Sequence, residues 1–232
     1  LVGSEMCIRD RGKCLYYIKR YDEAWMLMNQ ALDIAIQIDS KKQIVACHKQ
    51  LYYLCREFKR MMNERGDEQA STLFFRESLL HEMYFSEKPR LAELTVRYEA
   101  LRCDIMQQYY MNKDYDNVIR IATSLDIHDD TDPNASCLVY YYKAQAYVKL
   151  ENYPMAKEAF FRELELRKKY LGWEEEDTIL ACQNLGVLHS FCNEREEALA
   201  CFREAYGYEV KKNGEDSEMA QKLLQYISVV ES

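Results

Sequence analysis

Apolar residues recur along most of the chain at spacings of three and four positions, the repeat of an α-helix, and short polar clusters interrupt them. In the stretch 41–64, for example, Leu51, Leu54 and Phe58 fall on one helical face. The pattern predicts about eleven helices and gives no strand signal. The most clearly bounded helices are expected at 41–64, 91–111, 115–125, 133–150, 153–170, 174–191, 194–212 and 217–230.

Turn and capping residues mark several of the expected helix ends. Ser40, Asp132 and Asn152 each stand just before a helical stretch, where a short polar side chain can accept a backbone N–H. Pro154 follows Asn152 in the first turn, the one helical position that tolerates proline. Gly66 lies in the polar segment that ends the helix at 41–64. These residues predict short, well-defined turns.

One pattern appears twice in the second half of the chain, with a period of 42 residues. Ala156 and Ala198 are one period apart, and so are Phe160 and Phe202. The same period relates Ala144 to Gly186 and Gly172 to Gly214. Small residues allow helices to cross closely, and aromatic side chains fill the gaps between them. A fixed period of this size predicts an array of stacked helix pairs.

The residues of this pattern resemble the tetratricopeptide repeat. The resemblance is carried by Asn184-Leu185-Gly186-x-x-His189 and by Glu197-Ala198-x-x-x-Phe202-x-x-Ala205. The connectors, with Leu171-Gly172 and Asp177-Thr178, are similar to the 42-residue subtype of kinesin light chains and many bacterial proteins. The resemblance implies an all-α, right-handed superhelix of about five helix pairs and a closing helix. The expected repeats are 12–39, 41–85, 90–126, 133–171 and 174–212, with the closing helix at 215–230.

The first residues differ in character from the rest. The segment 1–10, LVGSEMCIRD, together with Arg11, resembles the translation of a sequencing adapter. We therefore expect 1–11 to be a non-native leader, Cys7 to be non-native, and the natural protein to extend upstream. The repeat array would then be one domain covering 12–232.

Composition narrows the classes of function. The net charge of −8 disfavours binding to nucleic acid or to an anionic membrane surface. No apolar run approaches the roughly 20 residues of a membrane span. Nine cysteines without a signal peptide suggest a reducing compartment, and the expected location is cytoplasmic.

Few residues in the sequence have the spacing of known metal-binding motifs. Asp130, Asp132 and Asn134 have the spacing of a calcium loop, but the later positions lack the required Gly and Glu, so a turn is favoured. His189 and Cys192 are three apart on a helix, where packing in the core is the favoured interpretation.

No catalytic constellation stands out either. His81-Glu82 lacks the second His of a zinc-peptidase helix, and His48, His81 and His128 have no companions at a recognisable catalytic spacing. Glycine-rich phosphate loops are absent from the sequence. We expect no enzyme activity, no cofactor, no metal and no small-molecule substrate.

The resemblance implies that the first helix of each repeat lines a concave groove. Asn and Gln amides can bond both the N–H and the C=O of an extended backbone, and Tyr offers rigid contact area. Asn184 matches the family position that often bonds a peptide backbone. The expected groove residues are Tyr141, Tyr142, Gln145, Lys149, Gln183, Asn184, Val187, Gln107, Tyr110, Lys49, Tyr53 and Arg56.

Two hypotheses for function follow. The first is a non-catalytic module that binds an extended peptide or a partner helix in the concave groove. The second is the sensory or regulatory region of a larger bacterial signalling or transcriptional regulator truncated at its N-terminus. An intact reading frame with an adjacent output domain would favour the second.

Overall fold

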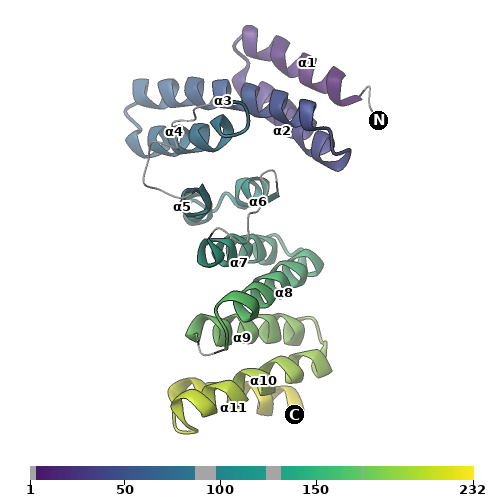
Figure 1. Ribbon diagram of the computed structural model, residues 1–232, viewed down its shortest axis with the longest axis vertical. Helices are drawn as coiled ribbons and strands as arrows, with labels where there is room; N and C mark the ends of the chain where they lie inside the picture. The colour runs from purple at the N-terminus through teal and green to yellow at the C-terminus, as the bar shows by residue number, and fades with distance from the viewer. Residues whose placement is uncertain (1–3, 87–97, 124–131, 174) are drawn as a thin grey trace. The chain divides into compact units, whose positions relative to one another are not determined.

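The computed structural model describes residues 4–86, 98–123, 132–173 and 175–232, and all regular structure in these ranges is α-helical. Consecutive helices pack against each other as pairs, which confirms the predicted all-α class (Figure 1). The described helices are α1 (Ser4–Tyr17), α2 (Tyr21–Gln37), α3 (Lys41–Glu64), α4 (Glu68–Glu82), α5 (Tyr98–Met111), α6 (Tyr115–Thr123), α7 (Pro133–Lys149), α8 (Tyr153–Tyr170), α9 (Glu176–Phe191), α10 (Arg195–Asn213) and α11 (Glu218–Glu231).

The chain divides into two compact units. Unit 1 comprises Leu1–Asn112 with Thr123–Asp126, and unit 2 comprises Lys113–Ala122 with Ile127–Ser232. Unit 1 therefore holds α1 to α5, and unit 2 holds α6, apart from its last residue Thr123, and α7 to α11. The helices predicted as the third pair, α5 and α6, belong to different units. A single continuous array over 12–232 stays a prediction.

The predicted helix ends agree closely with the structure. The stretches 41–64 and 153–170 coincide with α3 and α8, and 133–150 ends one residue later than α7. The prediction at 91–111 is described only from Tyr98 onward, since 91–97 lie outside the described residues. The turn predicted at Asp130, Asp132 and Asn134 lies partly outside them, since Asp130 is not among the described residues.

The predicted caps are mostly in place. The Ala135 N–H donates to the Asp132 carboxylate at 3.2 Å, and the Met155 N–H donates to the Asn152 side chain at 3.5 Å. The prediction that the Ser40 side chain caps α3 was wrong. Ser40 stands at the N-cap of α3, but its side chain accepts no capping hydrogen bond. Asp67 at the start of α4 has nearly the same backbone angles and does cap its helix, so the backbone of Ser40 does not account for the missing bond.

Short turns between helices repeat one backbone geometry. Glu151 and Asn193 have φ of 58° and 60°, the left-handed conformation that L-residues adopt at a cost. The residue after each donates its N–H back into the preceding helix, Asn152 to Tyr147 O and Glu194 to His189 O, both at 2.9 Å. This six-to-one bond closes the last turn of the helix. The same positive φ is found at Lys19, Asp39 and Lys113.

The core of unit 2 is built from the residues of the 42-residue pattern. Ala156 and Ala198 are fully buried, and Phe160 and Phe202 are almost so. A Cβ placed on Gly186 would lie 2.8 Å from Phe202 Cε1. The glycine therefore lets α9 approach α10 as closely as the aromatic ring allows, as predicted from the pattern.

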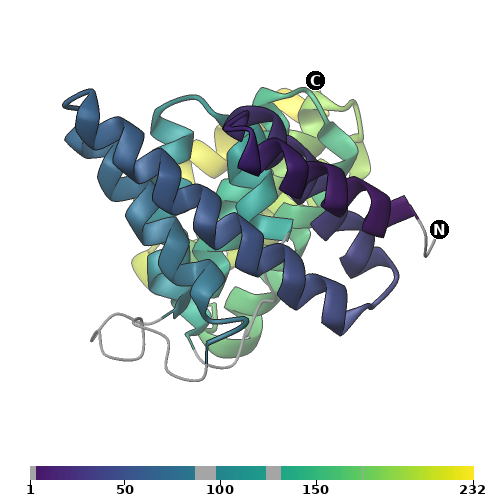
Figure 2. The same cartoon turned by 90° about the horizontal axis from the view of Figure 1, so that it is seen from above.

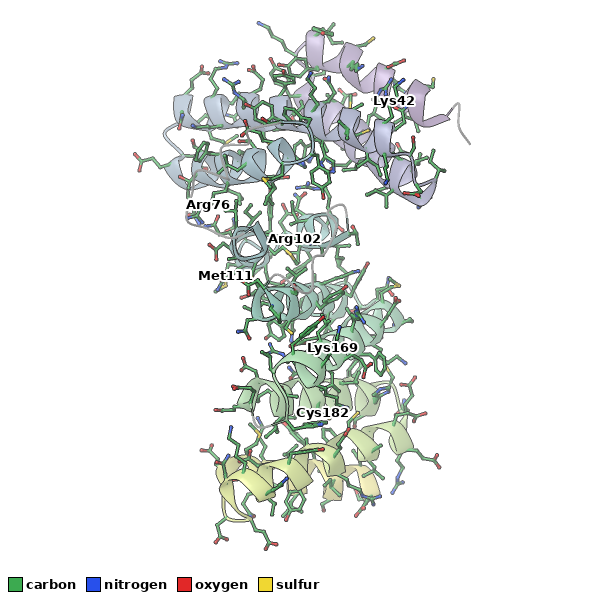
Figure 3. The ribbon with its side chains drawn as sticks, viewed as in Figure 1. Lys42, Arg76, Arg102, Met111, Lys169 and Cys182 are labelled. Atoms are coloured by element: carbon green, nitrogen blue, oxygen red, sulfur yellow. The ribbon has the colours of Figure 1, made fainter. Side chains whose placement is uncertain are left out.

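A buried thiol belongs to the same interface. Figure 3 labels Cys182 where α9 faces α10, and its Sγ donates to the Cys201 carbonyl oxygen at 3.3 Å. The hydrogen bond to Cys201 and burial both raise the pKa of the Cys182 thiol. Cys182 therefore stays protonated and acts as a small apolar side chain in the packing of α9 against α10.

The last helix, α11, covers the far side of α10. Ala220 and Leu223 of α11 are fully buried, and the Tyr226 ring stacks on Phe202 with centroids 5.2 Å apart. Ser217 caps this helix through its hydroxyl. The expected closing helix is therefore present, over 218–231. It supplies the apolar contacts that a following helix pair would otherwise make.

Unit 1 has its own core. Met28, Leu32 and Leu51 are fully buried between α2 and α3, and Phe58 of α3 stacks on Phe74 of α4 at 5.0 Å. Helices α3 and α4 pack side by side, as the views in Figures 1 and 2 show. All residues of this cluster belong to unit 1.

The segment 4–11, predicted to be part of a non-native leader, forms the first turns of α1. Arg9 in this segment bonds to Gln43 of α3. Helical structure does not reveal the origin of these residues, so the non-native leader remains a prediction.

Among the helices that the structure describes, none combines the length and apolar character that a bilayer span requires. A cytoplasmic location remains a prediction from composition.

Candidate interaction groove

Two pockets lie along α7 and α9, the first helices of two successive pairs in unit 2. The first has a volume of about 250 Å³ and the second about 300 Å³. Lining the first are Gln145, Val148, Tyr153, Phe160, Asn184, Val187, Leu188 and Phe191. Lining the second are Leu138, Tyr141, Glu163, Arg167, Asp177, Leu180, Ala181 and Asn184.

Asn184 lines both pockets, so the two adjoin at its side chain. We call the surface formed by the lining residues of both pockets the α7–α9 groove. On α7, Tyr141 and Gln145 are four residues apart, and on α9, Asn184 and Val187 are three apart, so each pair shares one helix face. Helix periodicity thus places these side chains in a row beside the seam.

The first pocket is mainly apolar, with two amides at its edge. Val187 and Phe191 expose 41% and 66% of their surface, and the Phe191 ring lies 5.1 Å from that of Tyr153. Gln145 and Asn184 are half-buried. Sites for drug-sized ligands span roughly 300–1,000 Å³. A pocket of about 250 Å³ is therefore better matched to one or two peptide side chains.

The second pocket has a charged wall. Arg167 Nε donates to Glu163 Oε1 at 2.8 Å, and Arg167 Nη1 lies 3.3 Å from Asp177 Oδ2. Glu163 and Arg167 are both buried, whereas Asp177 is exposed. Burial raises the pKa of Glu163 to about 7, although the Arg167 guanidinium acts in the opposite direction. Glu163 lies one 42-residue period before Ala205, so it stands where the other copy of the pattern has a small residue. The pair couples α8 to the start of α9.

The structure brings together four of the seven groove residues predicted in unit 2: Tyr141, Gln145, Asn184 and Val187. Tyr142 is half-buried with its ring 5.4 Å from Tyr141, and Lys149 is exposed; neither lines the groove. Gln183 is only 6% exposed. Its position on α9 turns it into the interior, so its side chain is not available at the open surface.

The five residues predicted in unit 1 are more scattered. Tyr53 and Arg56 line a separate pocket of about 460 Å³ on α3, together with Tyr16 of α1. Lys49 is exposed outside it, Gln107 is exposed on α5, and Tyr110 is half-buried there. Within unit 1, the predicted residues do not form a single surface.

Apart from Val187, the apolar members of the groove were not predicted from the sequence, Phe191 above all. The signal was available, because Phe191 follows Val187 by four residues and Asn184 by seven, on the same helix face. Sequence reasoning also missed the buried Glu163–Arg167 pair, although an acid and a base four residues apart on a helix are an ordinary pairing signal.

The interpretation of His189 as a core residue needs correction. His189 is partly exposed, and its Nδ1 lies 2.6 Å from Glu194 Oε2, across the turn between α9 and α10. Glu194 also pairs with Lys157 of α8, and the Lys157 and His189 hydrogen bonds lower the pKa of the Glu194 carboxyl. Glu194 therefore holds the His189 imidazole near the surface. Through its contacts with His189 and Lys157, Glu194 connects α8, α9 and the start of α10.

Helix pairs that meet through small and aromatic residues define a tetratricopeptide-like repeat fold. Among the solved structures that resemble the chain is BtubC (BKLC) from P. vanneervenii, with a TM-score of 0.50 and 14% sequence identity. The match covers 90% of this chain and 82% of that chain. At this identity the likeness establishes the fold alone.

The TPR2AB domain of yeast Sti1, solved as a complex with pHSP90, is also similar, with a TM-score of 0.45 and 15% identity over the full length of both chains. No protein-family model matches the chain, and no curated protein does. The 42-residue subtype therefore remains a prediction from the sequence.

Proposed function

We propose that the chain is a non-catalytic interaction module that binds an extended peptide in the α7–α9 groove. The observation that supports this most is the junction of two pockets at Asn184, one apolar and one with a charged wall. An amide at such a junction can donate to a peptide C=O and accept from a peptide N–H. Side chains on either side of that peptide unit would then enter the two pockets.

The apolar pocket defines what the peptide should carry. Val187 and Phe191 leave apolar surface open to water, and covering it with a large apolar side chain would be favourable. The exposed carboxylate of Asp177 at the other pocket favours a basic or neutral residue there rather than an acidic one. The preferred partner is a peptide with one large apolar residue and a nearby basic residue.

A displayed peptide library selected on the purified chain tests this proposal. Peptides recovered by the selection should share a large apolar position, and their affinity can be measured by fluorescence anisotropy. Asn184→Ala should weaken binding by about tenfold, the value of one backbone hydrogen bond. Val187→Asp should weaken it by about tenfold to a hundredfold, because it places a charge in an apolar contact.

The matched control is Val229→Asp on α11, where an exposed valine lies outside both pockets. This variant should bind as the wild type does. The proposal fails if the library returns no peptide, or if Asn184→Ala and Val187→Asp bind as well as the control. A preference for helical over extended peptides of the same sequence would replace the extended peptide by a partner helix.

The regulatory hypothesis concerns sequence beyond this chain. It predicts that the intact reading frame encodes an output domain next to the repeats. It does not conflict with peptide binding, because a regulator of this kind would use the same groove as its input.

A further inference from the structure

Unit 1 brings three metal-ligating side chains together between α3 and α4. Cys55 comes from α3, and Glu77 and His81 come from successive turns of α4. Cys55 Sγ, a Glu77 carboxylate oxygen and a His81 ring nitrogen lie within 4.8 Å of one another, and all three residues are fully buried. Cysteine and histidine are 26 positions apart in the sequence, so no search for closely spaced ligands would have found them.

We propose that Cys55, Glu77 and His81 bind a zinc ion. Thiolate, imidazole and carboxylate are the three ligand types that zinc takes in proteins. His81 Nε2 and Glu77 Oε1 lie 3.6 Å apart. Nitrogen and oxygen ligands at about 2.0–2.2 Å from a tetrahedral ion are separated by roughly 3.3–3.5 Å. Three protein ligands leave the fourth position of the ion for water.

Neighbouring side chains hold two of these ligands in a suitable orientation. His48 Nδ1 lies 2.9 Å from His81 Nδ1, so an Nδ1–H on His81 can donate to His48 and leave Nε2 for the ion. The Tyr109 hydroxyl donates to Glu77 Oε2 at 2.7 Å, and the other oxygen, Oε1, is the one that lies near His81 Nε2. Metal-binding histidines and carboxylates in proteins are commonly positioned by such hydrogen bonds.

The His48 ring is itself fixed. Tyr84 stacks on it with centroids 3.7 Å apart and an interplanar angle of 13°. His48 and Tyr109 are thus positioning residues, and three helices (α3, α4 and α5) contribute to the cluster. This site lies in unit 1 and is independent of the proposed peptide groove in unit 2.

A zinc ion would also suit the electrostatics of the cluster. The ion would bring two positive charges beside a thiolate and a carboxylate, and opposite charges attract strongly in a protein interior. Binding would therefore join α3 to α4 and raise the stability of the folded chain in proportion to the logarithm of the zinc affinity.

Titration of the metal-free full chain with Co²⁺ and then Zn²⁺ tests the site. Cys7 and Cys14 are exposed thiols, so the titration uses a Cys7→Ser/Cys14→Ser background. We expect one equivalent of Co²⁺ with a thiolate-to-cobalt charge-transfer band, which Zn²⁺ displaces while raising the thermal midpoint. A tetrahedral d–d spectrum would accompany the band.

Two variants on α3 distinguish the loss of a zinc ligand from the loss of a buried thiol. Cys55→Ala should abolish the charge-transfer band, whereas Cys47→Ala should keep it, because Cys47 is equally buried on α3 but is not in the three-residue group. Tyr109→Phe should keep the band while weakening zinc binding by about 10-fold to 100-fold. Far-UV circular dichroism of each metal-free variant checks that the helices are retained.

The proposal is overturned if the background protein shows no stoichiometric band, or if Cys55→Ala keeps it. It is equally overturned if Cys47→Ala removes the band while Cys55→Ala does not. Should Cys55→Ala lose its helical signal, His81→Gln provides the second test, because it leaves the thiol in place and should still lower the affinity for zinc by at least about tenfold. Unchanged zinc affinity in His81→Gln would overturn the proposal as well.

Discussion

Helix pairs α3/α4 and α9/α10 share one hairpin plan but fill their interfaces in different ways. Between α9 and α10, the ring of Phe202 meets the bare backbone of Gly186, and Ala198 is fully buried nearby. Between α3 and α4, His48 and His81 make a buried polar contact at 2.9 Å. The first interface depends on the fit of apolar shapes, whereas the second combines the stacking of Phe58 on Phe74 with a buried polar contact whose hydrogen-bond geometry must be met.

This difference explains why one pair shows its repeat in the sequence and the other does not. Close packing against a ring requires a small residue at one fixed position, so the requirement appears as a period. A polar cluster can be assembled from several residue types at several positions, as long as each group finds a partner. The repeat pattern is therefore clearest where the helix interface contains the fewest polar side chains.

Phe202→Ala should have the largest effect and would sharpen the comparison most. Removing the ring leaves a cavity against Gly186, with an expected loss of about 3–5 kcal/mol in the free energy of unfolding. Urea unfolding followed by circular dichroism measures it. Phe191→Ala is the control, because that ring is largely exposed and its removal should cost less than about 1 kcal/mol. Equal losses in the two variants would contradict the close-packed interface.

Glu163→Gln tests the buried polar pair of unit 2 through pH. The folded pKa of Glu163 is raised from 4.5 to about 7, so the folded state holds a proton that the unfolded state releases. The resulting stability is present below pH 4.5 and is lost as pH rises through 7, by on the order of 1–3 kcal/mol. Glu163→Gln should remove this decline, as measured by urea midpoints from about pH 4.5 to about pH 8. Parallel pH curves for variant and wild type would contradict it.

Two glycines in the same helix pair should respond to alanine in opposite directions. A methyl on Gly186 would meet the Phe202 ring at 2.8 Å, so overpacking should outweigh the gain in helix propensity, with a net loss of about 1–2 kcal/mol. On Gly207 of α10, a methyl would meet no other described side chain or neighbouring helix within 4 Å, so Gly207→Ala should gain about 0.5–1 kcal/mol. Thermal midpoints give the sign directly, and a gain in both variants would contradict the close approach of α9 and α10.

The smallest expected effect concerns the turns of two helix pairs in unit 2, α7/α8 and α9/α10. Glu151 has a positive φ without being a glycine, so Glu151→Gly should relieve backbone strain and gain about 0.5–1 kcal/mol. Asn193→Gly should gain less, since Asn tolerates this conformation better than Glu. Urea midpoints of the two single variants provide the comparison. A larger gain at Asn193 would show that side-chain contacts, rather than backbone strain, control these turns.

Helix positions and the small-to-aromatic seam were predictable because they depend on local periodicity and on one repeated contact. Asp132 and Asn152 were predictable as caps for the same reason, since a cap acts within three residues. The groove was predictable in part: Asn184 and Val187 follow from helix register, whereas Gln183 differs from Asn184 by one position and is buried.

The cluster of Cys55, Glu77 and His81 could not be predicted in this way. Its formation depends on how α3 and α4 are rotated about their own axes, and residues 26 positions apart carry no local sign of that rotation. The same holds for Tyr109, which reaches Glu77 from a third helix. Such tertiary contacts become visible only when the helices are placed in space.

Helix α11 also determines how the chain behaves when it is shortened. Leu223 and Tyr226 shield the outer side of Phe202 and α10, so a version ending before Ser217 would leave that side uncovered. Such a surface has the shape and chemistry to accept an equivalent helix from another molecule. We therefore expect the fourteen residues of α11 to limit self-association through this face of α10.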